Sequence, residues 1–174
     1  MSPRPVLVTG AAGKTGRAVI RALAARGDRI RGLVRRPEQA AELEAQGEAE
    51  TIAGDLLDPD ALARACAGTR AVYHICPNLH PAEAEIGRAA IEAARAAGVE
   101  RFAFHSVLHP QIEAMPHHWR KLRVEEALIE SGLPFTILQP AAYMQNVLGR
   151  LAEIAETGRH RVPYPVETRL CLVD

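Results

Sequence analysis

Three glycines spaced three residues apart follow a short apolar run near the N-terminus. In the segment PVLVTGAAGKTGRAVIRALAARG they are Gly10, Gly13 and Gly16, and Thr9 directly precedes them. Where such glycines join a strand to a helix, they permit a tight turn, close approach of a diphosphate, and close packing of helix on sheet. The unpaired N–H groups and positive dipole end of the helix favour an anion. We therefore predict that this turn, including Thr9, binds a dinucleotide pyrophosphate; glycines kept only for tightness are the alternative.

The first helical turn after these glycines carries two polar side chains. Lys14 and Thr15 could bring a cation and a hydroxyl close to the phosphates, or they could be solvated residues of an ordinary helix. We include both among the predicted cofactor-binding residues.

The exit of the second predicted strand indicates which dinucleotide the chain prefers. NAD-binding domains place an acidic residue there, where it accepts hydrogen bonds from the adenosine ribose. In DRIRGLVRRPEQ the strand ends near Val34 and continues into Arg35 and Arg36, while Asp28 lies at the opposite edge. Guanidinium groups form strong contacts with a phosphate, so we predict NADP(H), with its 2′-phosphate on these arginines. Two surface arginines ahead of a helix are the alternative.

The exit of the third predicted strand reads GDLLDPD. Asp55 and Leu56 lie where the chain leaves the sheet, on the edge where open α/β sheets bind ligands. They could flank the adenine with an acceptor and an apolar wall, and we include both in the predicted site. Alternatively, Asp55 caps a turn.

These groups require a scaffold that brings the strand exits together, and the order of the elements predicts one. Strand-length apolar runs alternate with stretches of helical period, which is typical of a parallel sheet covered by helices. The predicted strands are Val6–Thr9, Ile30–Val34, Glu50–Ala53, Ala71–Ile75, Arg101–His105 and Phe135–Gln139. The predicted helices with recognisable ends are those from Asp58 to Gly68, from about Pro81 to Ala97 and from about Pro116 to Ser131. We therefore predict a Rossmann-type, doubly wound α/β fold with helices on both faces.

Length and composition exclude several other classes of protein. The 174 residues suffice for one domain, and the 48% hydrophobic and 24% charged fractions are ordinary for a globular chain. No run approaches the roughly 18 apolar residues of a membrane helix, and the 21 basic residues balance 21 acidic ones, so we expect neither membrane nor nucleic acid as a partner.

Cys66, Cys76 and Cys171 lack the spacing of a disulfide framework or zinc site, and the N-terminus lacks a secretory pattern. We expect a cytoplasmic protein without a metal.

Six segments together resemble one known family. VTGAAGKTG, LVRRP, GDLLD, FHSV, HHWRK and ESGLPFTILQPAAYMQN occur in the order found in atypical short-chain dehydrogenases of the NmrA-like kind. The resemblance implies an NADP(H)-binding reductase of quinones or other conjugated small molecules, or alternatively a redox sensor without turnover. It also implies that the ribose and nicotinamide are surrounded by Cys76, Pro77, Ser106, Lys121, Pro140 and Ala141.

Short-chain dehydrogenases commonly pair a proton-donating tyrosine with a lysine four residues later, which binds the ribose. His117 and Lys121 occupy the matching positions here, on one helix face. We predict Lys121 as the ribose-binding catalytic residue and His117, which titrates near neutral pH, as the candidate general acid. The alternatives are a solvent-facing His117 and a surface ion pair between Lys121 and Glu125. Ser106 could contact the substrate or merely end its strand.

The last part of the chain is expected to begin a substrate-side region, over residues 141–174, after a cofactor core over residues 1–140. AAYMQNVLGRLAEIAETGR is typical of a loop that enters an amphipathic helix, and RLCLVD of the start of a strand. The family implied by the resemblance continues further, so we expect a truncated substrate side. Apolar surface around Tyr143, Met144 and Leu148 would then be exposed, which favours either a homo-oligomer or binding to a further segment of the chain.

Overall fold

Six parallel strands form the central sheet in the computed structural model of the protein, which describes residues 4–45, 47 and 49–174. The strands lie in the order β3-β2-β1-β4-β5-β6. Their bounds are Val6–Val8 (β1), Ile30–Val34 (β2), Glu50–Ala53 (β3), Ala71–His74 (β4), Arg101–His105 (β5) and Phe135–Leu138 (β6). Every predicted strand is present within one residue of its expected ends, and the predicted Rossmann-type fold is confirmed.

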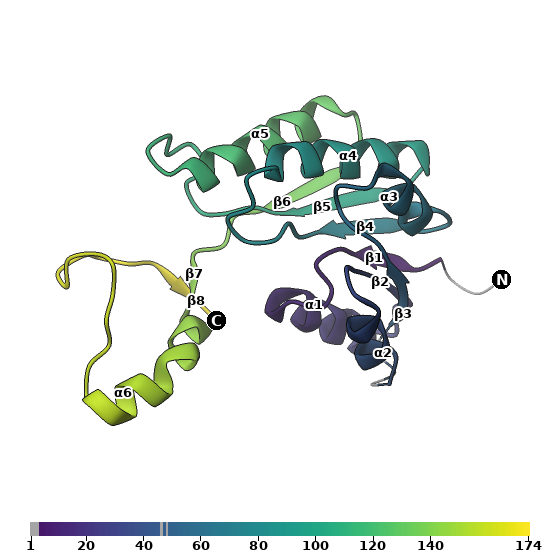
Figure 1. The fold of residues 1–174 in the computed structure, drawn as a ribbon. Helices are drawn as coiled ribbons and strands as arrows, with labels where there is room; N and C mark the ends of the chain where they lie inside the picture. The colour runs from purple at the N-terminus through teal and green to yellow at the C-terminus, as the bar shows by residue number, and fades with distance from the viewer. Residues whose placement is uncertain (1–3, 46, 48) are drawn as a thin grey trace.

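Helices cover both faces of this sheet (Figure 1). One face carries α1 (Lys14–Ala25) and α2 (Pro37–Ala45), and the other carries α3 (Pro59–Cys66), α4 (Glu83–Ala96) and α5 (Pro116–Glu130). The chain winds outward from β1 through β2 to β3, then returns to β4 beside β1 and continues through β5 to β6. The strand order therefore reverses between β1 and β4, where open α/β sheets bind their ligands.

The ends of α3 show why the helix predictions hold. Asp58 accepts a hydrogen bond from the backbone N–H two residues later, at 3.0 Å, and Pro59 occupies the first helical position. Gly68 follows the helix with a φ of 69°, a left-handed conformation that glycine adopts without strain. The glycines after α4 and α5 have the same conformation. α4 begins at Glu83, two residues after the predicted start at Pro81.

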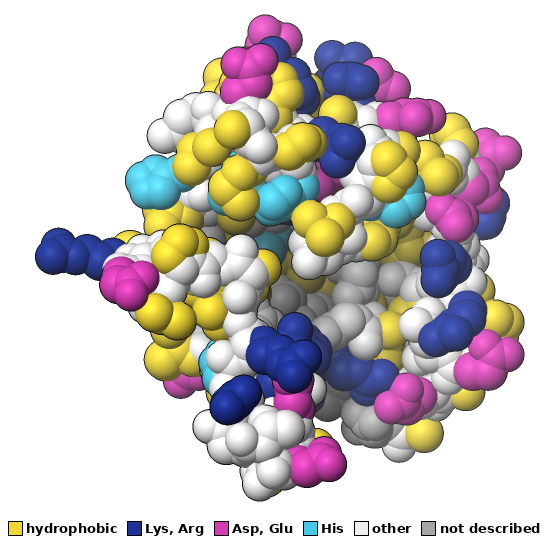
Figure 2. All heavy atoms as spheres, turned by 60° about the vertical axis from the view of Figure 1, so that its left-hand side comes forward, with side chains coloured by type: hydrophobic (Ala, Val, Ile, Leu, Met, Phe, Trp, Pro, Cys, Tyr) yellow, Lys and Arg dark blue, Asp and Glu magenta, His cyan; other side chains and the backbone are white. Residues whose placement is uncertain are grey.

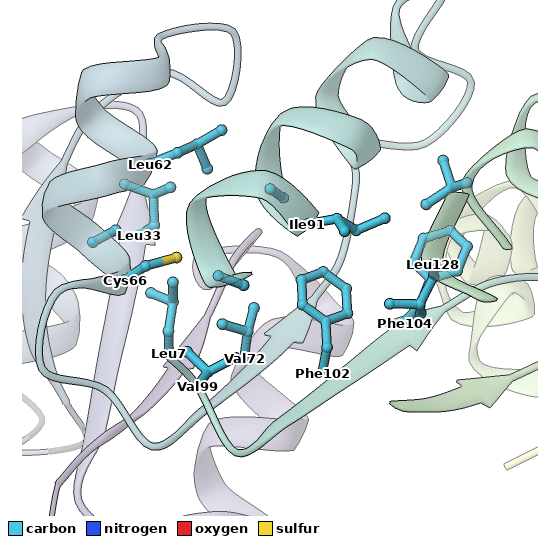
Figure 3. Close-up of a cluster of buried hydrophobic side chains, with 14 residues drawn as sticks. Leu7, Leu33, Leu62, Cys66, Val72, Ile91, Val99, Phe102, Phe104 and Leu128 are labelled. Carbon is cyan, nitrogen blue, oxygen red and sulfur yellow. The ribbon is translucent and has the colours of Figure 1, made fainter. Parts of the chain in front are cut away.

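The larger hydrophobic core lies between the sheet and helices α3, α4 and α5 (Figure 3). Phe102 and Phe104 of β5 both enter it and are fully buried, because alternate side chains of a strand point to the same face. A second core, which contains Val8, Ile20 and Leu43, fills the space between the sheet and helices α1 and α2. Both faces of the sheet are therefore packed, and the carboxyl ends of its strands stay available for a ligand.

Beyond β6 the chain leaves the sheet and extends past the carboxyl ends of the strands (Figure 1). This C-terminal segment comprises β7 (Ala142–Tyr143), the 3-10 helix η1 (Met144–Arg150), α6 (Leu151–Thr157) and β8 (Leu172–Val173), with β7 paired to β8. The predicted late helix and strand are both present, and Met144 and Leu148 are 48% and 60% exposed, as expected. No described helix combines the length and the apolar character needed to cross a bilayer. The division into a core over 1–140 and a substrate side over 141–174 stays a prediction.

Gly87 marks the closest approach of α4 to α5. A Cβ at this position would lie 2.4 Å from Cγ2 and 2.6 Å from Cγ1 of Val124. We expect Gly87→Ala to lower the free energy of unfolding by about 1–3 kcal/mol, because overpacking outweighs the better helix propensity of alanine. Gly149→Ala is the control, since a Cβ there would have no described atom within 4 Å. Urea unfolding should separate the two variants, and equal effects would contradict the packing argument.

Candidate functional site

A cleft of about 670 Å³ opens at the carboxyl edge of the sheet, where the strand order reverses. Figure 2 faces the side of the molecule on which the C-terminal segment lies and shows a hollow with histidine side chains above it and basic side chains below and beside it. The predicted site residues that line the cleft are Gly10, Gly13, Lys14, Thr15, Gly16, Arg35, Asp55, Leu56, Cys76, Pro77, Ser106, Lys121, Pro140 and Ala141. Thr9, Arg36 and His117 are not among its described lining residues.

The turn between β1 and α1 is too crowded to accept side chains. A Cβ at Gly16 would lie 2.3 Å from the carbonyl oxygen of Gly10 and 2.8 Å from Cα of Ala11. Gly10 itself has a φ of 61°, in the left-handed region. Gly13 precedes the first turn of α1 and supplies no side-chain cap, so the helix presents its first N–H groups at the cleft. A diphosphate fits this cradle, because it would meet those N–H groups and the positive end of the helix.

Thr9 lies beneath the turn. Its hydroxyl donates to the carbonyl oxygen of Ile75 at 3.0 Å and accepts from the Ile75 N–H at 2.8 Å. The side chain is fully buried and ties the end of β1 to the chain that leaves β4. Thr9 therefore holds the turn in place from below, and its predicted contact with a cofactor stays a prediction.

The two arginines after β2 occupy different positions. Arg35 lines the cleft together with Gln39, whereas Arg36 donates its backbone N–H to Oε1 of Gln39 at 3.1 Å and lies outside the described lining. Asp28 is at the opposite end of β2, where Nη2 of Arg70 lies 2.6 Å from its Oδ1. Asp28 therefore lies away from the cleft, as the sequence indicated, and Arg35 lies at it. The binding of a 2′-phosphate by Arg35 and Arg36 stays a prediction.

Asp55 serves the local turn and the cleft at once. Its Oδ1 accepts the Leu57 N–H at 2.9 Å, which is the turn-capping role weighed from the sequence. Asp55 and Leu56 also line the cleft, on the same side as Arg35. The two interpretations of Asp55 are therefore compatible.

The Ser106 hydroxyl is committed to a buried carboxylate. It donates to Oε1 of Glu125, and Nε2 of Gln139 lies 3.0 Å from each oxygen of the same carboxylate. Ser106 and Glu125 are 3% and 6% exposed. With its hydrogen engaged, the hydroxyl can accept a hydrogen bond from a ligand but has none to donate.

Lys121 pairs with Glu83 of α4. Its Nζ lies 2.5 Å from Oε1 of Glu83 and 3.4 Å from the carbonyl oxygen of His105. Glu83 is 1% exposed, and burial raises the pKa of its carboxyl while the Lys121 ammonium opposes that rise. The alternative prediction of a surface pair between Lys121 and Glu125 is therefore wrong, because α4 supplies a buried partner that local spacing does not show. The ammonium is held at the wall of the cleft, between α4 and β5.

His117 lies four residues before Lys121 on α5, but it is not among the described residues that line the cleft. It is partly exposed, and burial lowers the pKa of its imidazole, with His118 as the next contribution. His118 is buried, and its Nδ1 lies 3.0 Å from the carbonyl oxygen of His109. The role of His117 as a general acid stays a prediction.

Cys76 is a poor nucleophile although it lines the cleft. Burial raises the pKa of its thiol to about 12, and the Glu83 carboxylate adds to the rise. The thiol therefore stays protonated at neutral pH and contributes surface to the wall. Among the described residues, no group of three His, Cys, Asp or Glu side chains is placed to hold a metal ion.

Sequence reasoning missed a pair of cleft residues, His105 and Tyr143. The Tyr143 hydroxyl lies 2.6 Å from Nε2 of His105, and the Tyr73 hydroxyl lies 3.0 Å from Nδ1. Tyr143, expected as exposed apolar surface, is half-buried because this contact draws it inward. Strand alternation could have shown that Tyr73 and His105 share a face, since Tyr73 pairs with Ala103. No local pattern indicates Tyr143, which approaches from beyond β6.

The crossover at β1, the glycine cradle and the cleft together define a Rossmann-type dinucleotide-binding protein. Sequence comparison then identifies the family. A family model described as NAD(P)H-binding matches residues 10–162, and the chain belongs to this family. The prediction of a nicotinamide dinucleotide as cofactor is thereby confirmed.

Individual relatives narrow the comparison. The chain is 33% identical over 159 residues to the NAD(P)H azoreductase of Xenophilus azovorans, a match that covers 91% of this chain and 55% of the relative. It resembles the crystal structure of the Escherichia coli quinone oxidoreductase QOR2 with NADPH, with a TM-score of 0.78, 31% identity, and coverage of 88% of this chain and 54% of that one. A mutant of NmrA gives a TM-score of 0.73 at 25% identity, over 84% of this chain and 47% of that one, which confirms the NmrA-like resemblance. The chain spans about half the length of the curated relatives it matches.

The buried pair of Lys121 and Glu83 predicts a pH-dependent cost of removing the ammonium. We expect Lys121→Met to lower the free energy of unfolding by about 3–5 kcal/mol at neutral pH, because Glu83 is left buried without a partner. Without Lys121 the folded-state pKa of Glu83 rises further above its unfolded-state value of 4.5. A carboxyl whose pKa is higher in the folded state lowers the free energy of unfolding as the pH rises above its unfolded-state pKa. The stability loss of Lys121→Met should therefore shrink as the pH is lowered toward 4.5.

Urea unfolding at acidic and neutral pH checks this expectation. Adding Glu83→Gln to Lys121→Met should recover part of the loss at neutral pH, because the buried charge is gone. Arg150→Met is the control: it removes an exposed pair with Glu153 and should cost at most about 1 kcal/mol. A loss that is equal at both pH values would exclude the charged pair as its cause.

Proposed function

We propose that the protein is an NADPH-dependent oxidoreductase that reduces a quinone or another conjugated small molecule. The observation that carries this proposal is that one cleft is lined jointly by the glycine-rich turn, by Arg35 and by Lys121. The relatives support it, since one is named an NAD(P)H azoreductase and another quinone oxidoreductase 2. A cleft of about 670 Å³ is also of the size that small-molecule and cofactor sites occupy.

Each part of the cofactor has its own group of residues in this proposal. The N–H groups at the start of α1 bind the diphosphate, with Lys14 and Thr15 beside it, and Arg35 binds the 2′-phosphate. Asp55 and Leu56 flank the adenine. When bound, NADPH supplies a hydride to the acceptor. The ribose and nicotinamide end is enclosed by Cys76, Pro77, Ser106, Lys121, Pro140 and Ala141.

In this proposal the Lys121 ammonium binds the ribose. Because Glu83 already neutralises it from the α4 side, its remaining donors can bind neutral hydroxyls without leaving an unpaired charge in a buried site. The short contact to Glu83 also fixes the side chain before a ligand arrives. Lys121 therefore works as an oriented donor at the cleft wall.

A thermal melt with each dinucleotide tests the cofactor directly. NADPH at about 100 times its dissociation constant should add roughly 2.7 kcal/mol to the free energy of unfolding. NADH at the same concentration should add less, because it lacks the 2′-phosphate. Steady oxidation of NADPH in the presence of a quinone panel should accompany the binding. A larger shift with NADH, or binding without turnover of any quinone, would count against the proposal.

The two neighbouring arginines give a matched test of the 2′-phosphate site. We expect Arg35→Ala to weaken NADPH binding at least about tenfold, since a hydrogen bond to a charged group contributes about 1.5–3 kcal/mol. NADH binding should hardly change. Arg36→Ala removes the same charge one residue later, outside the described lining, and should leave both affinities close to those of the unmodified protein. Calorimetry measures the affinity of each variant for NADPH and for NADH. Equal losses of NADPH affinity in the two variants would mean that Arg35 has no special role in binding the 2′-phosphate.

A redox-sensing regulator is the second candidate function. It is favoured by the place of His117, which occupies the position of the usual proton-donating tyrosine yet lies outside the described cleft lining. Such a protein would bind NADPH and NADP⁺ with different consequences for a protein partner. Unequal affinity for a partner in the two states, without turnover of any quinone, would favour this function.

Location and assembly are part of the proposal. A cytoplasmic location is favoured by the free thiols, of which Cys66 and Cys76 are buried and Cys171 is exposed. Self-association is favoured by the apolar side chains of Met144 and Leu148 on the C-terminal segment. The partner in catalysis is a small molecule.

A further inference from the structure

Three ring side chains from three different strands form a continuous hydrogen-bonded row at the cleft. Tyr73 comes from β4, His105 from the end of β5, and Tyr143 from β7. The Tyr73 hydroxyl lies 3.0 Å from Nδ1 of His105, and the Tyr143 hydroxyl lies 2.6 Å from Nε2. The neighbouring ring centroids are 6.0 Å and 6.2 Å apart. Both nitrogens of one imidazole therefore have a phenol as their partner.

The position of the row gives its two ends different surroundings. His105 and Tyr143 line the cleft, whereas Tyr73 stands behind them, half-buried and outside the described lining. The charged group beside the row is the Lys121 ammonium, 3.4 Å from the carbonyl oxygen of His105, with Glu83 as its partner. One phenol thus lines the cleft and the other lies outside its described lining.

The protonation states suit proton transfer along the row. Burial, with a smaller contribution from Lys121, lowers the pKa of His105 to about 4, so its ring is neutral and carries one N–H. Burial also raises the pKa values of Tyr73 and Tyr143, so both phenols hold their protons at neutral pH. A neutral imidazole that loses a proton from one nitrogen can regain one at the other.

We propose that Tyr143 is the proton donor of the reduction, and that His105 and Tyr73 return its proton. This inference rests on the proposed function. Reduction of a quinone to a hydroquinone takes two electrons and two protons, of which a hydride supplies both electrons and one proton. The Tyr143 O–H bond breaks and its proton passes to the acceptor oxygen that bears the negative charge. Tyr143 then takes the Nε2 proton of His105, Nδ1 takes the Tyr73 proton, and solvent reprotonates Tyr73. Exchange of the ring proton with solvent then restores the Nε2–H form of His105 before the next turnover.

The arrangement explains how a cleft without the usual tyrosine on α5 can still present a phenol in its lining. His117 occupies that helix position but lies outside the described cleft lining, whereas Tyr143 reaches the cleft from β7 and lines it together with Lys121. His105 fixes the orientation of the Tyr143 hydroxyl through their contact. General acid catalysis requires this kind of positioned donor within reach of the substrate.

Kinetics of phenylalanine variants test the donor, with menadione as the acceptor. Tyr143→Phe should lower kcat about 100-fold or more, which is the usual contribution of general acid catalysis, while the dissociation constant of NADPH stays within about twofold. Tyr164→Phe removes the hydroxyl of an exposed tyrosine outside the described lining and should change neither quantity. Tyr73→Phe should leave the first turnover unchanged and slow steady-state turnover, because the donor is present but is not replenished.

Histidine NMR tests the row without any turnover. Tyr143→Phe should shift the Nε2 resonance of His105, Tyr73→Phe should shift its Nδ1 resonance, and Tyr164→Phe should shift neither. Unchanged ring-nitrogen resonances in the first two variants would mean that the row does not exist and would overturn the proposal.

The outcomes separate this proposal from the proposed function. Normal NADPH binding and menadione turnover in the unmodified protein, with kcat of Tyr143→Phe within about twofold, would overturn the proton donor and leave the reductase intact. A wild-type protein that binds no NADPH, or binds it without reducing any quinone of the panel, would overturn the proposed function and the donor together.

Discussion

The backbone crowding at the β1–α1 crossover is the constraint on which the rest of the structure depends. The carbonyl oxygen of Gly10 occupies the space that a Cβ at Gly16 would need, so the helix can start immediately beside the end of the strand. Thr9 bonds to Ile75 directly below and holds β1 against β4 at the same point. The chain diverges from there toward both edges of the sheet, and the cleft is the space that this divergence leaves.

The two sides of the cleft are built in different ways. Toward β2 and β3, backbone N–H groups of the turn and the exposed Arg35 are available to a ligand. Toward β5 and α5, the side chains are buried and already bonded to one another, as with Lys121 on Glu83 and Ser106 on Glu125. Unpaired polar groups in such surroundings are costly, so this wall is held rigidly before a ligand arrives. The side toward β2 and β3 suits the anionic part of a cofactor, and the side toward β5 and α5 suits its reactive end.

The fold was predictable from the sequence because its determinants are local. Strand-length apolar runs, the cap at Asp58 and the glycine at 68 each act within a few residues, and the structure reproduces them. The site was less predictable because its contacts join distant segments. Glu83 and Lys121 are 38 residues apart, and local spacing favoured Glu125 as the partner. Arg35 and Arg36 are identical residues in the sequence, so it gives no reason to choose between them. The path of the chain after β2 brings Arg35, and not Arg36, into the described lining of the cleft.

Tyr143 lies beyond residue 140, the predicted end of the cofactor core, yet it contacts a residue of that core. By position it belongs to the segment beyond β6, and by its contact with His105 it belongs to the wall built by β4 and β5. The apolar side chains that follow it, Met144 and Leu148, are exposed, so the core does not anchor the segment through them. The hydroxyl contact with His105 therefore links the start of this segment to the wall built by β4 and β5.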